Sequence, residues 1–460
     1  MEMKGIALLM VLAALTAGCE KAEQDPVIPE KESYLQEITS TVYYSPEEFI
    51  SYISDIVPAI SNELLNSPEV KKLGFGIAKF PEMVEMDTYD IFEKCNFTYR
   101  SLDVFGNPVV LSGSAMFINT TYPGKSHVMD DVTLYQPYWL SMDECGTGKG
   151  SPAMVRAAYN QLVVVPDFQG FGITQGIMHN PFLEYSALAR QSIDCEMAAL
   201  ELMDSLGIDM RCGYRTYNMG MSKGAPVAMA AQKLLENSEP RQVRNRIALK
   251  STYCCSGPYD LIGLTEKYIE KGEERNLWMI ALMVTSAYYS HPDIFAGYSI
   301  EDFFTDKFNQ VRVEKDGKMI SLTEWIDLLY CDEHDMIRTY REYGLTSVAD
   351  IFAPRFFDAE GRLNLSDPLV SAFVRVHKEN DPSQGWSPAT QLVLEHSKDD
   401  NFVVYDISYS CYERLKKDSD GNENPYVRES TWSGLDHEEI SVVGMLKMFF
   451  MRDPTVTLPQ

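Results

Sequence analysis

Short apolar runs recur along the chain and are separated by longer segments with a different rhythm. Each run is only a few residues long and is rich in residues that favour strands. Nearly continuous apolar runs are typical of strands buried on both faces, as in a parallel sheet. The runs lie at 132–135, 162–165, 214–219, 247–249 with a continuation towards Tyr253, and 392–394.

The segments between these runs have helical periodicity. Ile193, Met197 and Leu200 fall on one face of a helix, at positions i, i+4 and i+7. Residues 405–417 and 437–451 are predicted to form two further helices. Because strands and helices alternate along the chain, the pattern predicts an α/β fold with a doubly wound, mostly parallel sheet.

Three regions depart from this alternation. Residues 43–78 are predicted to be helical. Residues 93–117 alternate on either side of a turn at 105–108, which predicts an antiparallel hairpin at the edge of the sheet. From 257 to 387 helix-like segments follow one another before the chain returns to a strand, which predicts a helical cap inserted into the core. These segments are 261–272, 275–290 and 322–343.

The first nineteen residues predict export. Lys4 gives a positive start, and residues 6–15 are apolar but too short for a comfortable membrane span. The stretch ends in Leu-Thr-Ala-Gly-Cys at Cys19, which resembles the lipobox of bacterial lipoproteins with Thr where Leu is usual. This resemblance implies a lipid anchor on Cys19 in the bacterial cell envelope, with the membrane as a partner. An ordinary signal peptide with an incidental cysteine is the alternative.

The predicted domain organisation combines these regions, with an N-terminal extension before a core that the cap interrupts. The boundaries are 1–18 for the signal peptide, 19–33 for a tether, 34–92 for an N-terminal helical extension, 93–256 and 388–460 for the α/β core, and 257–387 for the cap. A second apolar stretch, 277–284, is too short to span a bilayer and is predicted to be a buried cap helix.

Charge and composition narrow the possible partners. The chain has 460 residues, 45% of them hydrophobic, and a net charge of −27 from 67 acidic and 40 basic residues. No basic cluster stands out against this acidity, which argues against nucleic acid as a partner. The cysteines after Cys19 show no C-x-x-C spacing, so the sequence predicts no metal site and no cofactor. Cys254 and Cys255 are predicted to be core residues.

The pentapeptide at 220–224, Gly-Met-Ser-Lys-Gly, is the strongest chemical signal in the chain. It follows the predicted strand at 214–219 and precedes a helix-like segment that starts at Ala225. A serine on a sharp strand-to-helix turn is held with its Oγ exposed, and glycines flank it where a Cβ would clash. Ser222 is therefore the predicted nucleophile.

A serine nucleophile needs a base to take its proton and an acid to orient that base. Asp399 and Asp400 follow the predicted strand at 392–394, at the strand end where α/β sites are found. His437 opens the last helix, so Ser, Asp and His occur in the chain order of α/β hydrolases. The spacing predicts His437 as the base and leaves either carboxylate as the acid.

With these motifs the chain resembles the α/β-hydrolase superfamily, and within it the secreted lipase and esterase group close to prolyl-oligopeptidase-like hydrolases. Residues 396–404 are similar to the family's acid segment H-G-x-x-D-x-x-V-P, and residues 166–172 to its P-D-[YF]-x-G-x-G stretch. The resemblance covers residues 93–451 and is loose in the insertion. It implies the α/β-hydrolase fold, Asp400 as the acid, and no catalytic role for His396.

An oxyanion hole needs two N–H donors. The first is predicted to be the backbone amide of Lys223, directly after the nucleophile. In relatives the second often comes from a Tyr-Gln-His-Gly loop, but residues 135–139 read Tyr-Gln-Pro-Tyr-Trp, and Pro137 has no N–H to donate. Tyr138 or Trp139, or a nearby hydroxyl, would have to serve instead, and Tyr138 is the preferred donor. The alternative is that the bulky side chains of Tyr138 and Trp139 shape an acyl pocket, and Trp139 is a predicted substrate-binding residue.

Further residues have weaker predicted roles. Trp278, Tyr288 and Tyr289 in the insertion are predicted to line an apolar substrate pocket. Asp167, in a glycine-rich turn, is predicted to be structural rather than to contact substrate. Asp194 is predicted to tether a helix.

The predicted function is that of a serine carboxylic-ester hydrolase that acts on a small-molecule or glycan-linked ester. A peptidase of the prolyl-oligopeptidase type is one alternative, although no repeats are present to build the usual propeller. A non-enzymatic, glycan-binding surface lipoprotein is another. A hydrolase scaffold that has lost its catalytic activity would be expected to lack a member of the triad. None is missing, so the enzyme is preferred.

Overall fold

The computed structural model describes residues 33–61, 84, 86–123, 127–138, 146–147, 151–328 and 333–455. All of these except Ser33 belong to one of the two units of the chain, Tyr34–Gln460. The predicted signal peptide, Cys19 and nearly all of the predicted tether lie outside the described residues, and so does Trp139.

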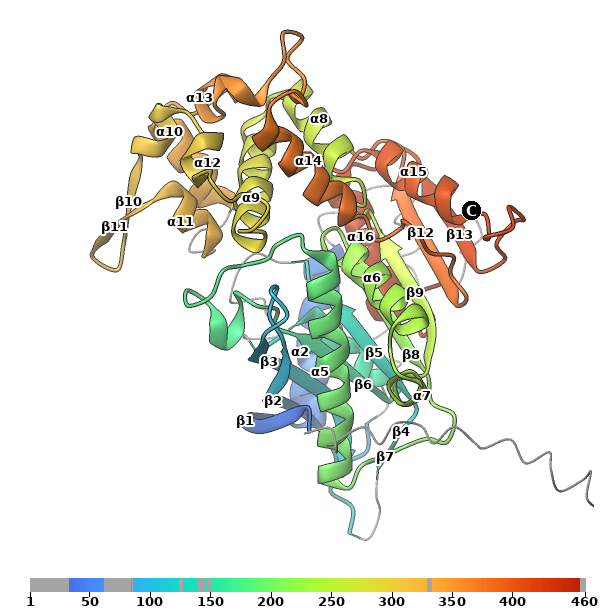
Figure 1. The fold of residues 1–460 in the computed structure, drawn as a ribbon. Helices are drawn as coiled ribbons and strands as arrows, with labels where there is room; N and C mark the ends of the chain where they lie inside the picture. The colour runs from blue at the N-terminus through green and yellow to red at the C-terminus, as the bar shows by residue number, and fades with distance from the viewer. Residues whose placement is uncertain are drawn as a thin grey trace, which may run out of the picture. The chain divides into compact units, whose positions relative to one another are not determined.

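A mixed sheet forms the centre of the described chain (Figure 1). From β1 to β6 in spatial order the neighbouring strands pair antiparallel, and from β6 onwards they pair parallel. The order is β1 (Leu35–Tyr44), β2 (Asp90–Leu102), β3 (Pro108–Thr120), β6 (Gln161–Pro166), β5 (Asp131–Gln136), β8 (Thr216–Met221), β9 (Leu249–Cys255), β12 (Gln391–Ser397) and β13 (Val427–Trp432). A small separate pair consists of β4 (Val128–Met129) and β7 (Asp209–Met210). The predicted hairpin is β2 and β3, and the apolar runs at 132–135, 162–165, 214–219 and 392–394 correspond to β5, β6, β8 and β12 of the parallel part. The run at 247–249 was placed too early, because Ile247 ends a helix and β9 begins only at Leu249.

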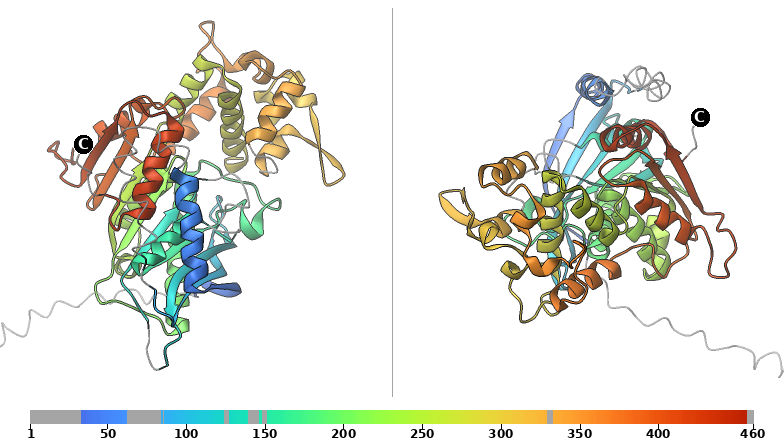
Figure 2. Two further views of the ribbon diagram at one scale, coloured as in Figure 1. Left: turned by 180° about the vertical axis from the view of Figure 1, so that it is seen from behind. Right: turned by 90° about the horizontal axis from the view of Figure 1, so that it is seen from above.

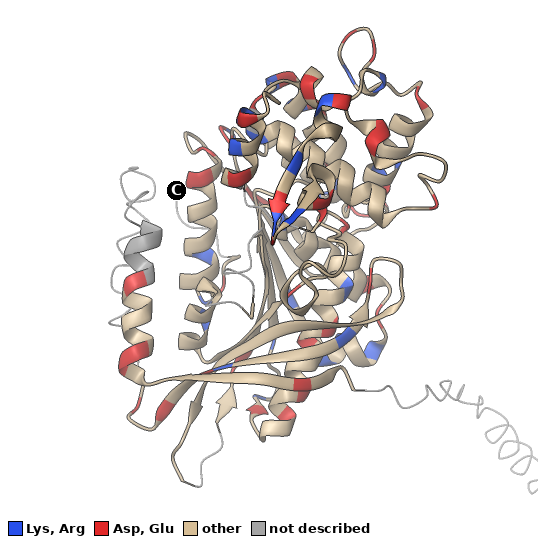
Figure 3. Cartoon of the chain, turned by 90° about the vertical axis from the view of Figure 1, so that its left-hand side faces the viewer, with Lys and Arg blue, Asp and Glu red and all other residues tan. Residues whose placement is uncertain are grey.

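Helices cover both faces of the sheet (Figure 2 and Figure 3). Side chains alternate between the faces along each strand. Leu392 and Leu394 of β12 pack against α6 and α15, whereas Val393 packs in the cluster that contains α16. One face of the sheet carries α5 (Tyr185–Leu206), α6 (Gly224–Asn237) and α15 (Tyr405–Leu415), and α7 (Arg241–Ile247) packs against α5 and α6. The other face carries α2 (Pro46–Ser61), the 3-10 helix η2 (Pro152–Tyr159) and α16 (His437–Phe450). A further 3-10 turn, η3 (Gly172–Thr174), follows β6. The predicted α/β fold, doubly wound around a mostly parallel sheet, is confirmed.

The chain between β9 and β12 forms the helical cap (Figure 1). Its elements are α8 (Leu261–Lys271), α9 (Glu274–Ser290), η4 (Ile300–Phe303), α10 (Asp306–Gln310), β10 (Arg312–Lys315), β11 (Lys318–Ser321), α11 (Leu322–Asp327), α12 (Glu333–Glu342), α13 (Val348–Ile351), η5 (Pro354–Phe356) and α14 (Pro368–Glu379). α9 contacts α8, α11, α12 and α14. One hydrophobic cluster joins Phe182 and Val227 of the core to Trp278 and Phe373 of the cap. The cap is therefore packed on the core through a shared apolar interior.

The apolar stretch at 277–284 lies within α9, in the middle of the cap. Leu277, Ile280 and Val284 are fully buried in the shared cluster. Within the ranges that the structure describes, none of the helices combines the length and the apolar content that crossing a membrane requires. The stretch is thus a buried cap helix, as predicted.

The predicted helical extension is wrong at its start. Residues 35–44 form β1, which pairs antiparallel with β2, and the helix α2 begins only at Pro46. Most β1 side chains are exposed, so the strand has no buried stripe from which its period could be detected. Its β-branched and aromatic residues, among them Ile38, Val42 and Tyr43, favour an extended strand at the sheet edge.

A buried ion pair fastens α16 to the sheet. Lys447 Nζ lies 2.7 Å from Glu395 Oε2, and the two side chains are 3% and 0% exposed. Trp432 Nε1 donates to Glu395 Oε1 at 2.5 Å, and the Tyr253 hydroxyl donates to Oε2. Breaking such a pair on one side would leave an uncompensated buried charge. The network therefore fixes the helix whose first residue is His437.

Glu196 of α5 makes the stability of the fold depend on pH. The side chain is fully buried, and burial raises its pKa from the ordinary 4.5 to about 8, although a hydrogen bond from the Thr216 hydroxyl opposes the rise. Between these pKa values the folded chain binds one proton more than the unfolded chain, so this contribution to stability is lost as the pH rises through the window. In the wild type the free energy of unfolding should therefore fall by a few kcal/mol as the pH rises through this window, at about 1.4 kcal/mol per pKa unit. Glu196→Gln should abolish this fall. Urea unfolding of both proteins from about pH 5 to about pH 8 measures this difference, and parallel pH curves would contradict it.

Candidate active site

Ser222 occupies a strained turn between a strand and a helix. β8 ends at Met221, Ser222 has a φ of +48°, and α6 begins at Gly224. A positive φ at a residue with a side chain costs about 1–3 kcal/mol and persists only where the surroundings impose it. A Cβ on Gly220 would lie 2.1 Å from the carbonyl oxygen of Gly224, and a Cβ on Gly224 would lie 2.2 Å from that of Gln136. The expectation that both flanking glycines are required is confirmed.

Asp400 and His437 are in direct contact. Asp400 follows β12, His437 is the first residue of α16, and the His437 Nδ1 lies 2.8 Å from the Asp400 Oδ2. The two residues are 5% and 6% exposed. Because Nδ1 faces the carboxylate, Nε2 is the ring nitrogen left to act on a nucleophile. The pair has the arrangement of a histidine base that an acid orients.

Three donors converge on the Asp400 carboxylate. Its Oδ2 accepts from His437 and from His396 Nε2, which is 3.0 Å away, and its Oδ1 accepts from the backbone N–H of Phe402 at 3.0 Å. Burial by itself would raise the pKa of Asp400, but the hydrogen bonds from His396 and His437 outweigh it and lower the pKa to about 2. The carboxylate is therefore ionised at neutral pH and can stabilise a protonated His437.

His396 is a site residue whose position relative to the acid was not predicted. Its Nε2 lies 2.7 Å from the carbonyl oxygen of Val403 as well as near Asp400, and its Nδ1 lies 2.5 Å from the Ser408 hydroxyl. A neutral imidazole with its proton on Nε2 donates to Asp400 and Val403 and accepts from Ser408, which satisfies every contact. His396 thus holds the acid in place without a direct role in the chemistry, which agrees with the implied lack of a catalytic role.

Asp399, the alternative acid, has a different partner. Its Oδ2 accepts from the backbone N–H of Gly434 at 2.6 Å, in the loop before His437. Asp436 is the N-cap of α16 and closes a capping box, so His437 does not serve as the cap. Asp399 and Asp436 therefore shape the loop and the helix start, whereas Asp400 contacts the imidazole.

The topology brings these residues to one edge of the sheet. Ser222 follows β8, Asp400 follows β12, and the loop that leads to His437 follows β13. β8, β9, β12 and β13 are consecutive parallel neighbours. The carboxyl ends of parallel strands meet at one edge of a sheet, where α/β proteins place their sites. Ser222 therefore lies at the edge that carries the acid and the base.

The predicted oxyanion donors flank the same turn. Lys223 is the N-cap of α6, where the first N–H groups lack an acceptor within the helix. Tyr138 comes directly after Pro137 at the end of β5 and is half-buried. The close approach of Gly224 to Gln136 places the chain after β5 beside the turn. The oxyanion roles of Lys223 and Tyr138 stay predictions.

The Lys223 side chain has an unusual environment. Its Nζ lies 4.7, 5.2 and 5.5 Å from the ring centres of Phe182, Phe171 and Phe168. The residue is 4% exposed, and burial lowers the pKa of its amine to about 7. Contact with the faces of three aromatic rings offsets part of the cost of burying the ammonium. The side chain thus attaches the residue after Ser222 to the segment between β6 and α5.

The three aromatic residues predicted to line a substrate pocket take part in the packing of the cap. Trp278 is 1% exposed inside the shared cluster. Tyr288 donates to the carbonyl oxygen of Tyr298 at 3.1 Å, and its ring centre lies 5.2 Å from that of Tyr289. The Tyr289 ring in turn lies 5.6 Å from the ring of His179. Their role in substrate binding stays a prediction.

Asp167 and Asp194 have structural roles, as predicted. The Asp167 Oδ2 accepts from the hydroxyls of Ser112 at 2.7 Å and Thr147 at 2.5 Å. The Asp194 Oδ2 accepts from the Ser101 hydroxyl at 2.9 Å and so ties α5 to the end of β2. Both are almost fully buried, which confirms the structural interpretation.

A second Ser–His–Asp chain links the cap to the core. The His179 Nδ1 contacts the Asp327 Oδ1, and its Nε2 lies 2.8 Å from the Ser290 hydroxyl. Ser290 is the last residue of α9, where carbonyl groups rather than N–H groups lack partners. The negative end of a helix disfavours a developing oxyanion. This chain is therefore suited to joining α9, α11 and the segment before α5, and not to nucleophilic catalysis.

The described cysteines offer no further chemistry at the site. Cys254 and Cys255 are fully buried, as predicted for core residues. The thiols of Cys95, Cys195, Cys212, Cys254, Cys255 and Cys411 are free. Over the residues that the structure describes, no group of His, Cys, Asp and Glu is placed to hold a metal ion.

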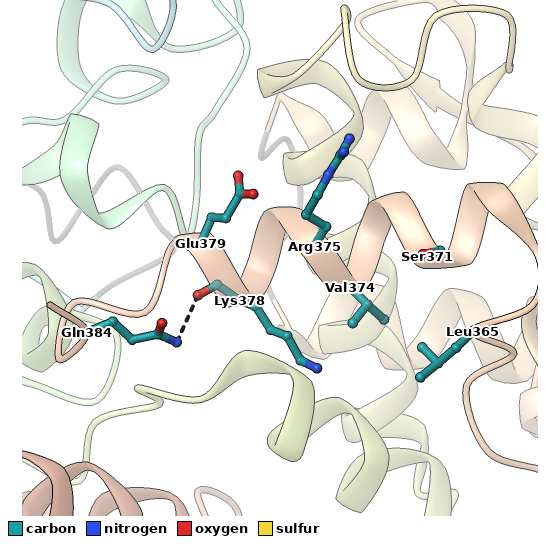
Figure 4. Close-up of a pocket in the computed structure, with 7 residues that line it drawn as sticks. All are labelled: Leu365, Ser371, Val374, Arg375, Lys378, Glu379 and Gln384. Atoms are coloured by element: carbon teal, nitrogen blue, oxygen red, sulfur yellow. Dashed lines mark hydrogen bonds between the residues drawn. The ribbon is translucent and has the colours of Figure 1, made fainter.

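A surface pocket of about 400 Å³ lies along α14 (Figure 4). Its lining residues are Leu365, Ser371, Val374, Arg375, Lys378, Glu379 and Gln384. The Gln384 side chain donates to the carbonyl oxygen of Lys378 at 3.2 Å (Figure 4). Ser222, Asp400 and His437 are not among the lining residues, so this pocket belongs to the cap surface and not to the candidate site.

Comparison with known proteins supports the fold assignment. No protein-family model matches the chain, and no curated protein matches it. The rice cell wall degrading esterase LipA from Xanthomonas oryzae matches with a TM-score of 0.62 at 15% identity, over 90% of this chain and 97% of that chain. A protein from Legionella pneumophila matches with a TM-score of 0.61 at 14% identity, over 92% and 100% of the two chains. Candida antarctica lipase A in its closed state matches with a TM-score of 0.55 at 13% identity, over 91% and 83%.

Identities this low carry information about the fold and not about the reaction. The matches extend over the core and the cap, because they cover about nine tenths of this chain. In this chain the strand order of the sheet and the strand–serine–helix turn at Ser222 are typical of the same fold. The chain therefore has the α/β-hydrolase fold.

Proposed function

We propose that this protein is a serine carboxylic-ester hydrolase in which Ser222, His437 and Asp400 form the triad. The observation that carries the proposal is the contact between the His437 Nδ1 and the Asp400 Oδ2 at 2.8 Å. That contact leaves Nε2 free to take a proton, at the sheet edge where Ser222 is held in a strained turn.

The reaction runs through an acyl-enzyme. The Ser222 Oγ attacks the ester carbonyl carbon while the His437 Nε2 takes the hydroxyl proton, and the ionised Asp400 stabilises the resulting imidazolium. Backbone N–H groups of Lys223 and Tyr138 stabilise the negative charge on the former carbonyl oxygen. His437 then passes the proton to the leaving alkoxide, which departs as the alcohol. A water then gives a proton to the His437 Nε2 and attacks the acyl carbon, and the carboxylic acid leaves as His437 returns that proton to the Ser222 Oγ.

The substrate class is a small-molecule or glycan-linked ester. The resemblance to LipA, a rice cell wall degrading esterase, favours an ester in cell-wall material. The resemblance to Candida antarctica lipase A favours a lipid ester. A peptidase remains the second candidate, because amide hydrolysis uses the same triad.

A substrate panel separates these candidates. The purified chain is assayed with p-nitrophenyl esters of increasing acyl length, with acetylated xylan, and with fluorogenic aminoacyl-proline amides. The proposal predicts turnover of at least one ester series and no measurable cleavage of the amides. Cleavage of the amides at a higher kcat/KM than any ester would assign a peptidase instead, and no turnover of any substrate would favour a binding protein.

A further inference from the structure

Phe402 lies at the junction of the acid, the base and the cap. It comes two residues after Asp400, in the loop between β12 and α15. Its backbone N–H donates to the Asp400 Oδ1 at 3.0 Å. Its ring centre lies 5.2 Å from that of the His437 imidazole, with an angle of 61° between the ring planes. The same residue therefore touches both partners of the acid–base pair.

The cap holds the Phe402 ring from two helices. Tyr268 of α8 stacks on it with ring centres 5.3 Å apart and an interplanar angle of 28°. The Arg275 guanidinium, at the start of α9, lies 4.1 Å from the centre of the Phe402 ring. Tyr268 is 1% exposed, so this wall of the cap is well packed. The ring is thus clamped by residues that belong to the cap and not to the core.

Two further contacts cross the same junction. Lys271 Nζ, at the end of α8, donates to the carbonyl oxygen of Asn401. Arg275 Nη1 lies 3.9 Å from the Glu438 carboxylate, in the first turn of α16. The ends of α8 and α9 therefore contact both segments that carry catalytic candidates, with Phe402 between them.

We propose that Phe402 is a positioning residue that fixes the His437 imidazole and transmits the placement of the cap to it. A single hydrogen bond at Nδ1 leaves the imidazole able to rock about that contact. The Phe402 ring limits this motion from one side, and the clamp from Tyr268 and Arg275 keeps the ring in place. This inference rests on the proposed function, because it assigns a task within the Ser222 mechanism.

The test replaces Phe402 in the full chain and separates kcat from KM. Phe402→Ala should lower kcat about 10- to 100-fold with KM changed less than about 3-fold, because a base displaced by a fraction of an ångström loses alignment while binding is kept. Tyr268→Ala should act in the same direction with a smaller effect, and the double variant should show less than the product of the two effects.

Two controls keep the test decisive. Phe357→Ala removes a half-buried aromatic ring elsewhere in the cap and should leave kcat within about 2-fold. Phe402→Leu keeps the apolar bulk without the ring, and serves if the alanine variant does not fold by circular dichroism; it should show the same loss in kcat. An unchanged kcat in a folded Phe402 variant, a loss confined to KM, or an equal loss in Phe357→Ala would overturn the inference.

Failure of this inference is distinguishable from failure of the proposed function. If Ser222→Ala is inactive and the Phe402 variants are as active as the wild type, only the positioning role is lost. If Ser222→Ala keeps its activity, the proposed triad itself fails and the Phe402 inference fails with it.

Discussion

Ser222→Ala should lower kcat for ester hydrolysis about a million-fold, to the level that substrate binding and the oxyanion donors support alone. The reason is that alanine offers no oxygen to attack the carbonyl, and the proton acceptor at His437 then has no proton to take. The strained φ of +48° is kept or relaxed without effect on this outcome, since the missing group is the nucleophile itself. Steady-state kinetics with the best p-nitrophenyl ester measures the effect.

Ser290→Ala is the matched control. Ser290 also lies 2.8 Å from a histidine nitrogen, and that histidine also contacts an aspartate. It is the last residue of α9, where the groups without helical partners are carbonyls rather than N–H groups, so its removal should change kcat less than about 3-fold. Loss of activity in Ser290→Ala with retention in Ser222→Ala would transfer the nucleophile to the second chain and refute the proposed triad.

Asp400→Asn should lower kcat about ten-thousand-fold at neutral pH. The amide carries no charge to stabilise the imidazolium, and it can present an N–H where the His437 Nδ1–H now finds an acceptor. The carboxylate has a pKa of about 2, so in the wild type it stays ionised throughout the range in which His437 acts as a base. Comparison of kcat in the variant and the wild type at neutral pH gives the size of the loss.

Asp399→Asn is the control for this change, because the two residues are adjacent and chemically identical. Asp399 accepts one hydrogen bond from the backbone of Gly434, and an asparagine oxygen can accept the same bond. The variant should therefore keep kcat within about 10-fold of the wild type. A loss in Asp399→Asn as large as that in Asp400→Asn would contradict the assignment of the acid.

The parallel core could be predicted because its strands are buried on both faces, so their apolar runs stand out in the sequence. The turn at Ser222 could be predicted because its glycines are needed locally, as the 2.1 and 2.2 Å approaches to Gly220 and Gly224 show. The edge strands β1 and β13 could not be predicted, because their side chains are mostly exposed or half-buried and show no apolar periodicity. β1 was instead included in a helical extension.

The finer parts of the candidate site depend on contacts between distant segments. The chain order of the triad does not distinguish Asp399 from Asp400; the family spacing implies Asp400, and the structure places the His437 ring against Asp400 and the Gly434 N–H against Asp399. The packing of Tyr268 and Arg275 on Phe402 joins the cap to a loop far along the chain. The hydrophobic periodicity of the sequence does not predict such a contact. The hydroxyl and carbonyl partners that orient His396 are likewise set by tertiary packing.

The most direct test of the central claim is the identity of the serine that a fluorophosphonate modifies. The intact chain is treated until ester turnover stops, digested, and mapped by mass spectrometry. We expect a phosphonyl adduct on Ser222 that accumulates in step with the loss of activity, and no adduct on Ser290. An adduct on another serine at full inhibition, or an unmodified Ser222 in an inactivated protein, would contradict it.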